Sequence, residues 1–283
     1  MRHSGAVEGM LRDADTGLDS RVAEVGDDQR HLTAAVAQVG IYKPCVDRVL
    51  VDIHQVKELR LVFLWIPAAF IVLSLLWVLL LKWVPPPVTP LMVHRAVEYR
   101  SDKDFHTHYK WVPYSKMSPE LSRAVIASED NLFLQHDGFD RGAIRQALKE
   151  KKEGRALRGA STISQQTAKN VFCSQRRSWV RKGFEAYFTV LIELIWGKRR
   201  ILEVYLNVAE MGKGIYGAQA AAKAYWGENA SAVSRRQACL LAACLPSPLK
   251  RSPVRPGDYT SRRAYAIASL ESKLSYPDWI YHK

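Results

Sequence analysis

The sequence predicts a mainly α-helical domain that follows a single membrane-spanning helix. Apolar side chains recur at helical spacing through most of the chain after residue 118, and strong strand-like alternation is lacking there. One run of 21 residues, 61–81, contains no charged residue. The helical stretches are 118–135, 140–153, 162–171, 179–196, 198–207, 216–225, 234–245 and 259–274.

The uncharged run, Leu61 to Leu81, is predicted to cross a membrane. As a helix it would be about 32 Å long, which is enough for a bilayer core. Trp77 and Trp83 near one end are typical of the membrane interface, and Pro67 is tolerated in a membrane helix. The alternative is a buried helix of a soluble protein, which the unbroken apolar run disfavours. The run starts too far from the N-terminus for a cleaved signal peptide, so we interpret it as an anchor.

The charges on either side of the anchor suggest its orientation. Residues 1–81 have 8 Lys+Arg against 10 Asp+Glu, a net charge of −2, whereas residues 82–283 have 33 against 18, a net charge of +15. A slight excess of basic residues just before the anchor places the N-terminus in the cytosol. We therefore predict a cytosolic tail (1–60), a membrane helix (61–81) and an outer domain (82–283). The basic domain would face anionic lipid, and nucleic acid is not expected as a partner.

The four cysteines do not indicate a metal or disulfide framework. No CxxC pair or Cys/His spacing typical of zinc sites occurs. Cys239 and Cys244 belong to an apolar run and are expected in the core. We predict no structural zinc and no disulfide framework.

The stretch SEDNLFLQHDGFD contains the first candidate site. Ser118 followed by proline is typical of a helix start. At about 100° per residue, Glu129 lies roughly 40° from Val125 and 60° from Leu132, at the edge of the apolar stripe. Asp130 falls about 100° further round, toward water. A partly dehydrated Glu129 suits a general base; the alternative is a boundary glutamate that reaches solvent.

A second cluster lies in GASTISQQTAKN. Ser161 is expected to cap a helix on which Gln165, Gln166 and Lys169 share one face. Together with Thr162, these donors near a helix N-terminus would make an anion site. A solvated polar face is the alternative.

A third cluster surrounds Glu185 with four cations, Arg176, Arg177, Arg181 and Lys182. The alternative is a surface ion pair between Arg181 and Glu185, worth a few tenths of a kcal/mol. So many cations near one carboxylate instead indicate a pocket for a multivalent anion such as pyrophosphate.

The stretch GKGIYG, 212–217, matches the dinucleotide pattern G-x-G-x-x-G. It follows a predicted helix rather than a strand and has no βαβ unit around it, which excludes that interpretation. Its glycines are expected to permit a tight turn between helices.

Four stretches in this order resemble the signature motifs of the peptidoglycan glycosyltransferases: EDNLFLQHDGFD, GASTISQQTAKN, RKGFE and KRRILEVYLNVAEMGKGIYGAQAAAKAYW. No transpeptidase region follows them, so the chain is most similar to the monofunctional biosynthetic branch. The resemblance extends from about Trp83 to the C-terminus. It implies a lysozyme-like, mainly α fold and polymerisation of lipid II, with lipid-linked glycan as donor and the GlcNAc 4-hydroxyl of lipid II as acceptor. Undecaprenyl pyrophosphate leaves, and inversion gives a β-1,4 link.

The resemblance also implies a role for each cluster. Glu129 matches the catalytic base, and Glu185 matches a second glutamate that orients cations or holds a divalent metal, Mg²⁺ or Mn²⁺. Lys169 and Arg177 match cations on the pyrophosphate side, with Arg181 and Lys182 in support. Ser161, Thr162, Gln165 and Gln166 match the donor-side segment, and Asp130, Phe133, His136 and Gly138 complete the first motif, in which we interpret His136 as structural.

The implied location is the bacterial inner membrane, with one span and the catalytic domain on the periplasmic side. The expected partners are lipid II, lipid-linked glycan, the membrane itself and other cell-wall synthases. The apolar segment VTPLMV, 88–93, is expected to help meet the bilayer. Two alternatives remain: a lytic transglycosylase or lysozyme-like enzyme that cleaves glycan, and an inactive cell-wall scaffold.

Overall fold

The structure is a computed structural model that describes residues 63–154, 161–176 and 178–281. The chain divides into two compact units, Met1–Val72 and Leu73–Lys283. The predictions for the tail (1–60), for the first two residues of the membrane run and for Arg177 lie outside the described residues.

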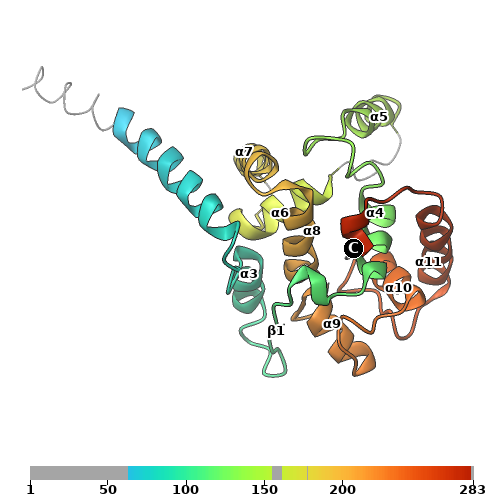
Figure 1. Cartoon of the computed structure of the whole chain (residues 1–283). Coiled ribbons are helices and arrows are strands. Elements are labelled where there is room, and N and C mark those ends of the chain that lie inside the picture. The colour runs from blue at the N-terminus through green and yellow to red at the C-terminus, as the bar shows by residue number, and fades with distance from the viewer. Residues whose placement is uncertain (1–62, 155–160, 177, 282–283) are drawn as a thin grey trace, which may run out of the picture. The chain divides into compact units, whose positions relative to one another are not determined.

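The second unit is mainly helical, as predicted, and helices form in every stretch that the periodicity indicated (Figure 1). Sequence periodicity did not indicate the short helix α3 (Pro90–Glu98), the single-turn 3₁₀ segments Tyr114–Lys116 and Asp278–Tyr281, or a small sheet. The other helices are α4 (Pro119–Glu129), α5 (Arg141–Lys152), α6 (Ile163–Phe172), α7 (Trp179–Ile195), α8 (Gly197–Val208), α9 (Gly217–Trp226), α10 (Arg235–Cys244) and α11 (Asp258–Glu271).

Helix α8 forms the centre of the core. It packs against α4, α6, α7 and α9. Six of its apolar side chains are at most 1% exposed: Ile201, Leu202, Val204, Tyr205, Leu206 and Val208. The charged residues Lys198, Arg199, Arg200 and Glu203 lie in the first two turns, and the remaining side chains of the helix face the core.

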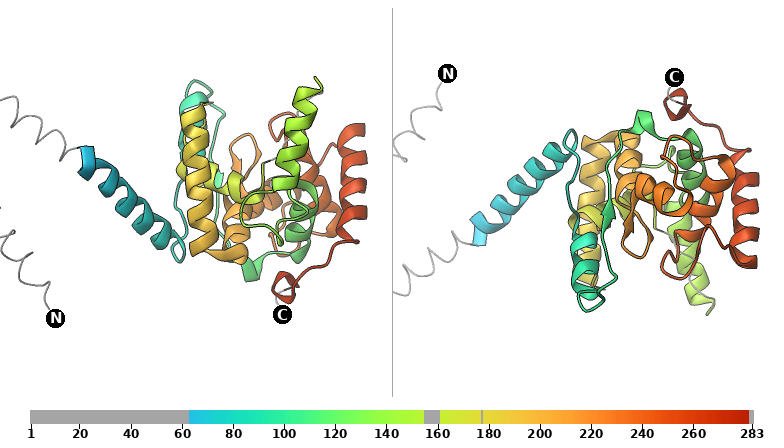
Figure 2. Two further views of the ribbon diagram at one scale, coloured as in Figure 1. Left: turned by 90° about the horizontal axis from the view of Figure 1, so that it is seen from above. Right: turned by 90° about the horizontal axis from the view of Figure 1, so that it is seen from below.

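Helices α4, α10 and α11 make up the other side of this unit. The three pack against one another, and both views of Figure 2 show α11, the red helix, at the edge of the group. Cys239 and Cys244 of α10 are buried with free thiols, which confirms that they belong to the core. This packing brings the C-terminal region of the chain beside α4.

The small sheet has the strand order β1 (His108–Tyr109), β3 (Ile215–Tyr216), β2 (Glu210–Gly212). Strands β2 and β3 are antiparallel, and β1 is parallel to β3. The expectation that GKGIYG turns between helices was therefore incomplete, because the turn joins two short strands that lie between α8 and α9. Gly214 has φ +72°, and a side chain there would meet the carbonyl oxygen of His106 at 2.2 Å.

The predicted helix 118–135 is wrong at its end. Helix α4 stops at Glu129, and Asp130 has φ −163° and ψ 78°. Asp130 and Leu132 therefore do not follow the helical progression, and only the contacts that they make can place them. The start agrees with the prediction: Ser118 accepts a hydrogen bond from the Glu120 N–H.

The last turns of the apolar helix Phe63–Leu81 pack within the second unit. Its final carbonyl groups lack helical partners and accept hydrogen bonds from side chains. The Trp196 indole donates to Val78 O at 2.7 Å, and Arg200 Nη2 donates to Leu81 O at 2.8 Å. Helices α7 and α8 thus hold the end of this helix in place.

Candidate active site

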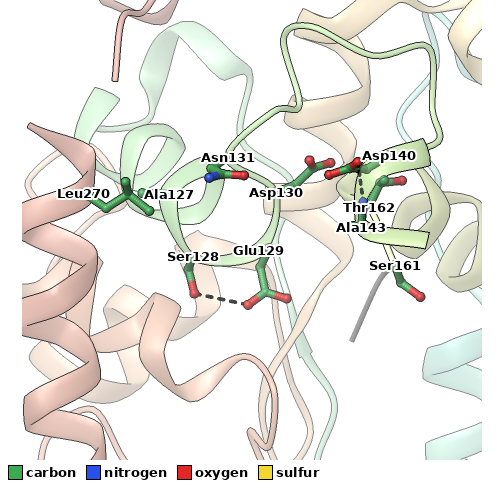
Figure 3. A pocket seen from close by; sticks show the side chains of 10 residues that line it. All are labelled: Ala127, Ser128, Glu129, Asp130, Asn131, Asp140, Ala143, Ser161, Thr162 and Leu270. Carbon is green, nitrogen blue, oxygen red and sulfur yellow. Dashed lines mark hydrogen bonds between the residues drawn. The ribbon is translucent and has the colours of Figure 1, made fainter. Parts of the chain in front are cut away.

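A pocket of about 280 Å³ opens where α4, α5, α6 and α11 meet (Figure 3). The carboxylate of Glu129 and the hydroxyl of Ser161 lie on different walls of it. The lining residues are Ala127, Ser128, Glu129, Asp130, Asn131, Asp140, Ala143, Ser161, Thr162 and Leu270. Glu129 therefore faces a cavity.

Glu129 is the last residue of α4, and its side chain is 11% exposed. The amide Nε2 of Gln166 donates to its Oε2 at 3.0 Å, and the Ser128 hydroxyl donates to its Oε1 at 3.2 Å. The two oxygens are thus held from opposite sides. Such a fixed, partly dehydrated carboxylate can accept a proton from a bound hydroxyl group.

The amide of Gln166 is itself oriented by Tyr205, whose hydroxyl donates to Gln166 Oε1 at 3.2 Å. Burial, followed by the nearby charges of Glu129 and Asp130, raises the pKa of Tyr205 well above its ordinary value. The phenol is therefore a permanent O–H donor, and it turns the Nε2 of Gln166 toward Glu129.

Asp130 does not face water, so that prediction was wrong. It is 7% exposed, its Oδ1 pairs with His136 Nε2 at 2.9 Å, and its Oδ2 accepts from the Ile163 N–H at 3.0 Å. The physical reason is that the first N–H groups of α6 have no helical partners and attract a carboxylate. Asp130 thus joins the end of α4 to the start of α6.

The start of α6 also differs from the prediction. Thr162, not Ser161, is the N-cap, and it forms a capping box with Gln165. Gln165 is 5% exposed, and its Oε1 accepts from the Thr162 N–H. Because Asp130 already supplies a negative charge here, this helix end does not offer the open anion site that the sequence suggested.

The cations gather instead where α6 ends and α7 begins. Arg181 and Lys182, in the first turns of α7, both pair with Glu185, whose side chain is 3% exposed. Lys169 lies in the last turn of α6 and interacts electrostatically with all three. The N-terminal end of α7 adds the positive end of a helix dipole. Three of the predicted cations therefore form one cluster.

Lys169 is the most unusual member of this cluster. Burial lowers the pKa of its ammonium group, the neighbouring charges of Arg181 and Lys182 lower it further, and Glu185 opposes them. Among the described residues, no carboxylate forms an ion pair with Lys169. A partly buried cation that has no ion pair of its own in the described part of the chain is suited to receive an anionic ligand.

Helix α6 connects the two halves of the site. Gln166 holds Glu129 from this helix, and Lys169 follows one turn later, about 4.5 Å further along the helix axis. The carboxylate of Glu129 and a cluster of cations thus flank one short helix. This arrangement can remove a proton from a nucleophile and stabilise an anionic leaving group.

The described side chains fit a protein-held metal poorly. Both oxygens of Glu185 are already paired with cations. No group of three or more His, Cys, Asp or Glu side chains suited to a metal occurs among residues 63–154, 161–176 and 178–281. Mg²⁺ commonly takes most of its oxygen ligands from substrate phosphates and water. The predicted Mg²⁺ or Mn²⁺ therefore stays a proposal, and no step below depends on it.

Three further residues of the stretch EDNLFLQHDGFD, which do not line the pocket, contact α6 and α8. Phe133 is fully buried under the ammonium of Lys198, which lies 4.6 Å from the ring centre. Lys198 also donates to the carbonyl of His136, while Gly138 O accepts from the Thr162 hydroxyl at 2.7 Å. These contacts tie the loop after α4 to α6 and α8.

Substitution of Gly138 by alanine should lower the free energy of unfolding by about 2–5 kcal/mol. Gly138 has φ +86°, and a Cβ there would lie 2.8 Å from Thr189 Cγ2 and 3.0 Å from Glu193 Cγ. Gly183→Ala is the matched control, because a Cβ there meets no atom within 4 Å and alanine favours the helix. Thermal unfolding in detergent measures both; equal midpoints would contradict the prediction.

Sequence reasoning missed Ser128, Tyr205 and Arg263 as parts of the site. Tyr205 belongs to an apolar helical face in the sequence and gave no polar signal. Arg263, in α11, lies 3.8 Å from Glu129 Oε1, although 134 positions separate the two residues. No local pattern in the sequence indicates such a contact.

Comparisons with known proteins agree on one family. A family model described as Transglycosylase matches residues 95–271. A biosynthetic peptidoglycan transglycosylase of Pseudomonas putida is 50% identical over 226 residues, which cover 80% of this chain and 94% of the relative. A protein of the same name from Caulobacter vibrioides is 53% identical over 190 residues, covering 67% and 81%. Another from Pseudomonas aeruginosa is 50% identical over 218 residues, covering 77% and 92%.

Proposed function

The chain belongs to the transglycosylase family, and from this premise we propose how its active site lengthens glycan chains. It is a peptidoglycan glycosyltransferase that polymerises the glycan chain. We assign lipid-linked glycan as the donor and lipid II as the acceptor. The residue roles rest on one observation about α6. Gln166 of this helix donates a hydrogen bond to Glu129, and Lys169, one turn later, lies among other cations.

Glu129 acts as the general base. It takes the proton from the GlcNAc 4-hydroxyl of lipid II as that oxygen bonds to C1 of the donor MurNAc. The bond from C1 to the pyrophosphate oxygen breaks at the same time, and attack from the opposite face gives a β-1,4 link. The hydrogen bonds from Gln166 and Ser128 keep the carboxylate turned toward the pocket.

Lys169, Arg181 and Lys182 stabilise the departing undecaprenyl pyrophosphate. Negative charge develops on the leaving group in the transition state, and fixed cations in a partly buried site stabilise that charge without reorganising. Glu185 holds Arg181 and Lys182 in place. Arg177, which lies outside the described residues, would add a fourth cation.

The cation cluster also argues against the lytic alternative. An enzyme that cleaves glycan releases a sugar hydroxyl and has no need of a partly buried lysine beside two more cations. The scaffold alternative is disfavoured because Glu129 faces a pocket and both of its oxygens are held.

The membrane supplies the substrate and anchors the enzyme. The helix Phe63–Leu81 is long and apolar enough to cross a bilayer. We propose that it lies in the bacterial inner membrane with the catalytic domain on the periplasmic side. In the segment 88–93, Val88 and Val93 are exposed, whereas Leu91 and Met92 are buried against Tyr216, so only part of this segment is free to meet lipid. Contacts with other cell-wall synthases stay a prediction.

The direct test uses purified full-length protein in detergent with labelled lipid II. We expect long glycan that lysozyme digests. Release of short or anhydro-sugar fragments from cell-wall sacculi, without polymer from lipid II, would favour the lytic alternative. Turnover of neither substrate would favour the scaffold.

A further inference from the structure

We infer that Arg263 of α11 is a positioning residue for the catalytic base. It acts through Ser128, and the inference rests on the proposed role of Glu129. None of the four signature stretches contains Arg263, and it reaches the site only because α11 packs on α4.

The guanidinium group of Arg263 donates hydrogen bonds to the last turn of α4. Its Nη2 donates to Ser128 O at 3.3 Å and to Ser128 Oγ at 3.2 Å, and it lies 3.8 Å from Glu129 Oε1. The last carbonyl groups of a helix have no helical partner and carry partial negative charge. Helix α4 has no basic residue in its own last turn. Arg263 therefore supplies from another helix the cation that this end lacks.

This contact determines how Ser128 bonds to Glu129. The oxygen of the Ser128 hydroxyl accepts the hydrogen bond from Arg263. The single hydrogen of that hydroxyl is then available to donate to another group. That O–H has two acceptors within reach, Glu129 Oε1 at 3.2 Å and Ala242 O at 3.3 Å. Ser128, oriented by Arg263, thus holds one oxygen of the base, while Gln166 holds the other.

Helix α11 also forms one wall of the pocket. Leu270 lines it, and Arg263 lies seven residues earlier, which is about 20° away on the same helical face. The helix that closes the pocket therefore also carries the group that holds the base. Since Arg263 Nη2 is beyond hydrogen-bond distance from Glu129, its effect on the base is exerted by placement and charge rather than by direct bonding.

The test compares Arg263→Ala, Arg263→Lys and Ser128→Ala with wild type, using full-length protein and lipid II in detergent. We expect Arg263→Ala to lower kcat about 10- to 100-fold, because small misplacements of catalytic groups are costly. The KM of Arg263→Ala should stay within about 3-fold of the wild-type value, because Arg263 positions the base and does not bind the substrate. Arg263→Lys should be intermediate, since it keeps the charge but loses the planar fork. Added guanidinium ion should restore part of the activity of Arg263→Ala.

Arg262→Ala is the matched control, because Arg262 is the neighbouring arginine on α11 and is exposed. It should behave as wild type. The double variant Ser128→Ala/Arg263→Ala should lose no more activity than the worse single variant. The reason is that each substitution interrupts the same series of contacts from Arg263 through Ser128 to Glu129.

Three results would overturn the inference: wild-type turnover in Arg263→Ala, a raised KM with unchanged kcat, or losses that multiply in the double variant. If Arg263→Ala does not fold, the comparison of Arg263→Lys with Ser128→Ala decides the same question. Absence of polymer from the wild-type protein would contradict the proposed function itself, whereas an active wild type with an unaffected Arg263→Ala would contradict only this inference.

Discussion

Replacement of Glu129 by glutamine should lower the rate of glycan polymerisation by about 10²- to 10⁴-fold, the usual contribution of a general base. Glutamine has the same shape but cannot accept the proton of the acceptor hydroxyl. The measurement is the initial rate of polymer formation from labelled lipid II by purified full-length protein.

The fold should tolerate this change. The Glu129 side chain is 11% exposed and accepts two hydrogen bonds, one of which a glutamine carbonyl can still receive. A thermal midpoint close to that of wild type would separate the loss of chemistry from a loss of structure. Asp137→Asn is the matched control, since Asp137 is an exposed acid in the same loop and should be dispensable. A Glu129→Gln enzyme with more than about a tenth of wild-type activity would exclude this residue as the base.

Replacement of Lys169 by methionine should lower kcat by about 10²- to 10³-fold, as expected for loss of a group that stabilises developing charge. Methionine fills a similar volume but has no positive charge for the leaving pyrophosphate. Steady-state kinetics with lipid II measure the change, and Lys273→Met, which removes an exposed lysine from the C-terminal segment, is the control.

The same substitution should not destabilise the fold. Burial lowers the pKa of Lys169, which means that folding disfavours its charged form. The thermal midpoint of Lys169→Met should therefore equal or exceed that of wild type. Because the unfavourable charge disappears as pH rises through the lowered pKa, the stability difference between the two proteins should shrink in that direction. A strong destabilisation together with lost activity would show that Lys169 is structural.

The pKa of Lys169 also affects activity. In the pH profile of kcat, the decrease at alkaline pH should begin at a lower pH than an ordinary lysine would produce. The reason is that the ammonium group of Lys169 loses its proton at a lower pH. An arginine at this position stays charged, so any activity that Lys169→Arg retains should extend to higher pH.

Prediction from the sequence worked best where the information is local. Periodicity located α5 to α11 within a few residues. The contacts of Arg181 and Lys182 with Glu185 were also recognised, because residues three and four apart on a helix are neighbours in any fold. Lys169 had been assigned to a different cluster, and only the packing of α6 against α7 brings it to these residues.

Prediction failed where a polar group found its partner elsewhere. Asp130 was expected in water, but the free N–H groups of α6 provided a buried partner. Gln165 was assigned to a ligand, but its side chain closes the capping box with Thr162. In both cases an N–H group at the N-terminus of α6 donates to the side-chain oxygen.

By itself, the sequence determined most of the helices, the apolar anchor run and the chemical groups available to the site, because helical spacing and residue type are local properties. Only the tertiary structure decided which partner each of these groups has. The packing of α11 on α4 brings Arg263 to Ser128, and the packing around α8 brings Tyr205 to Gln166. Buried polar groups must be satisfied by whatever lies beside them in space, and segments far apart in the chain supplied those neighbours.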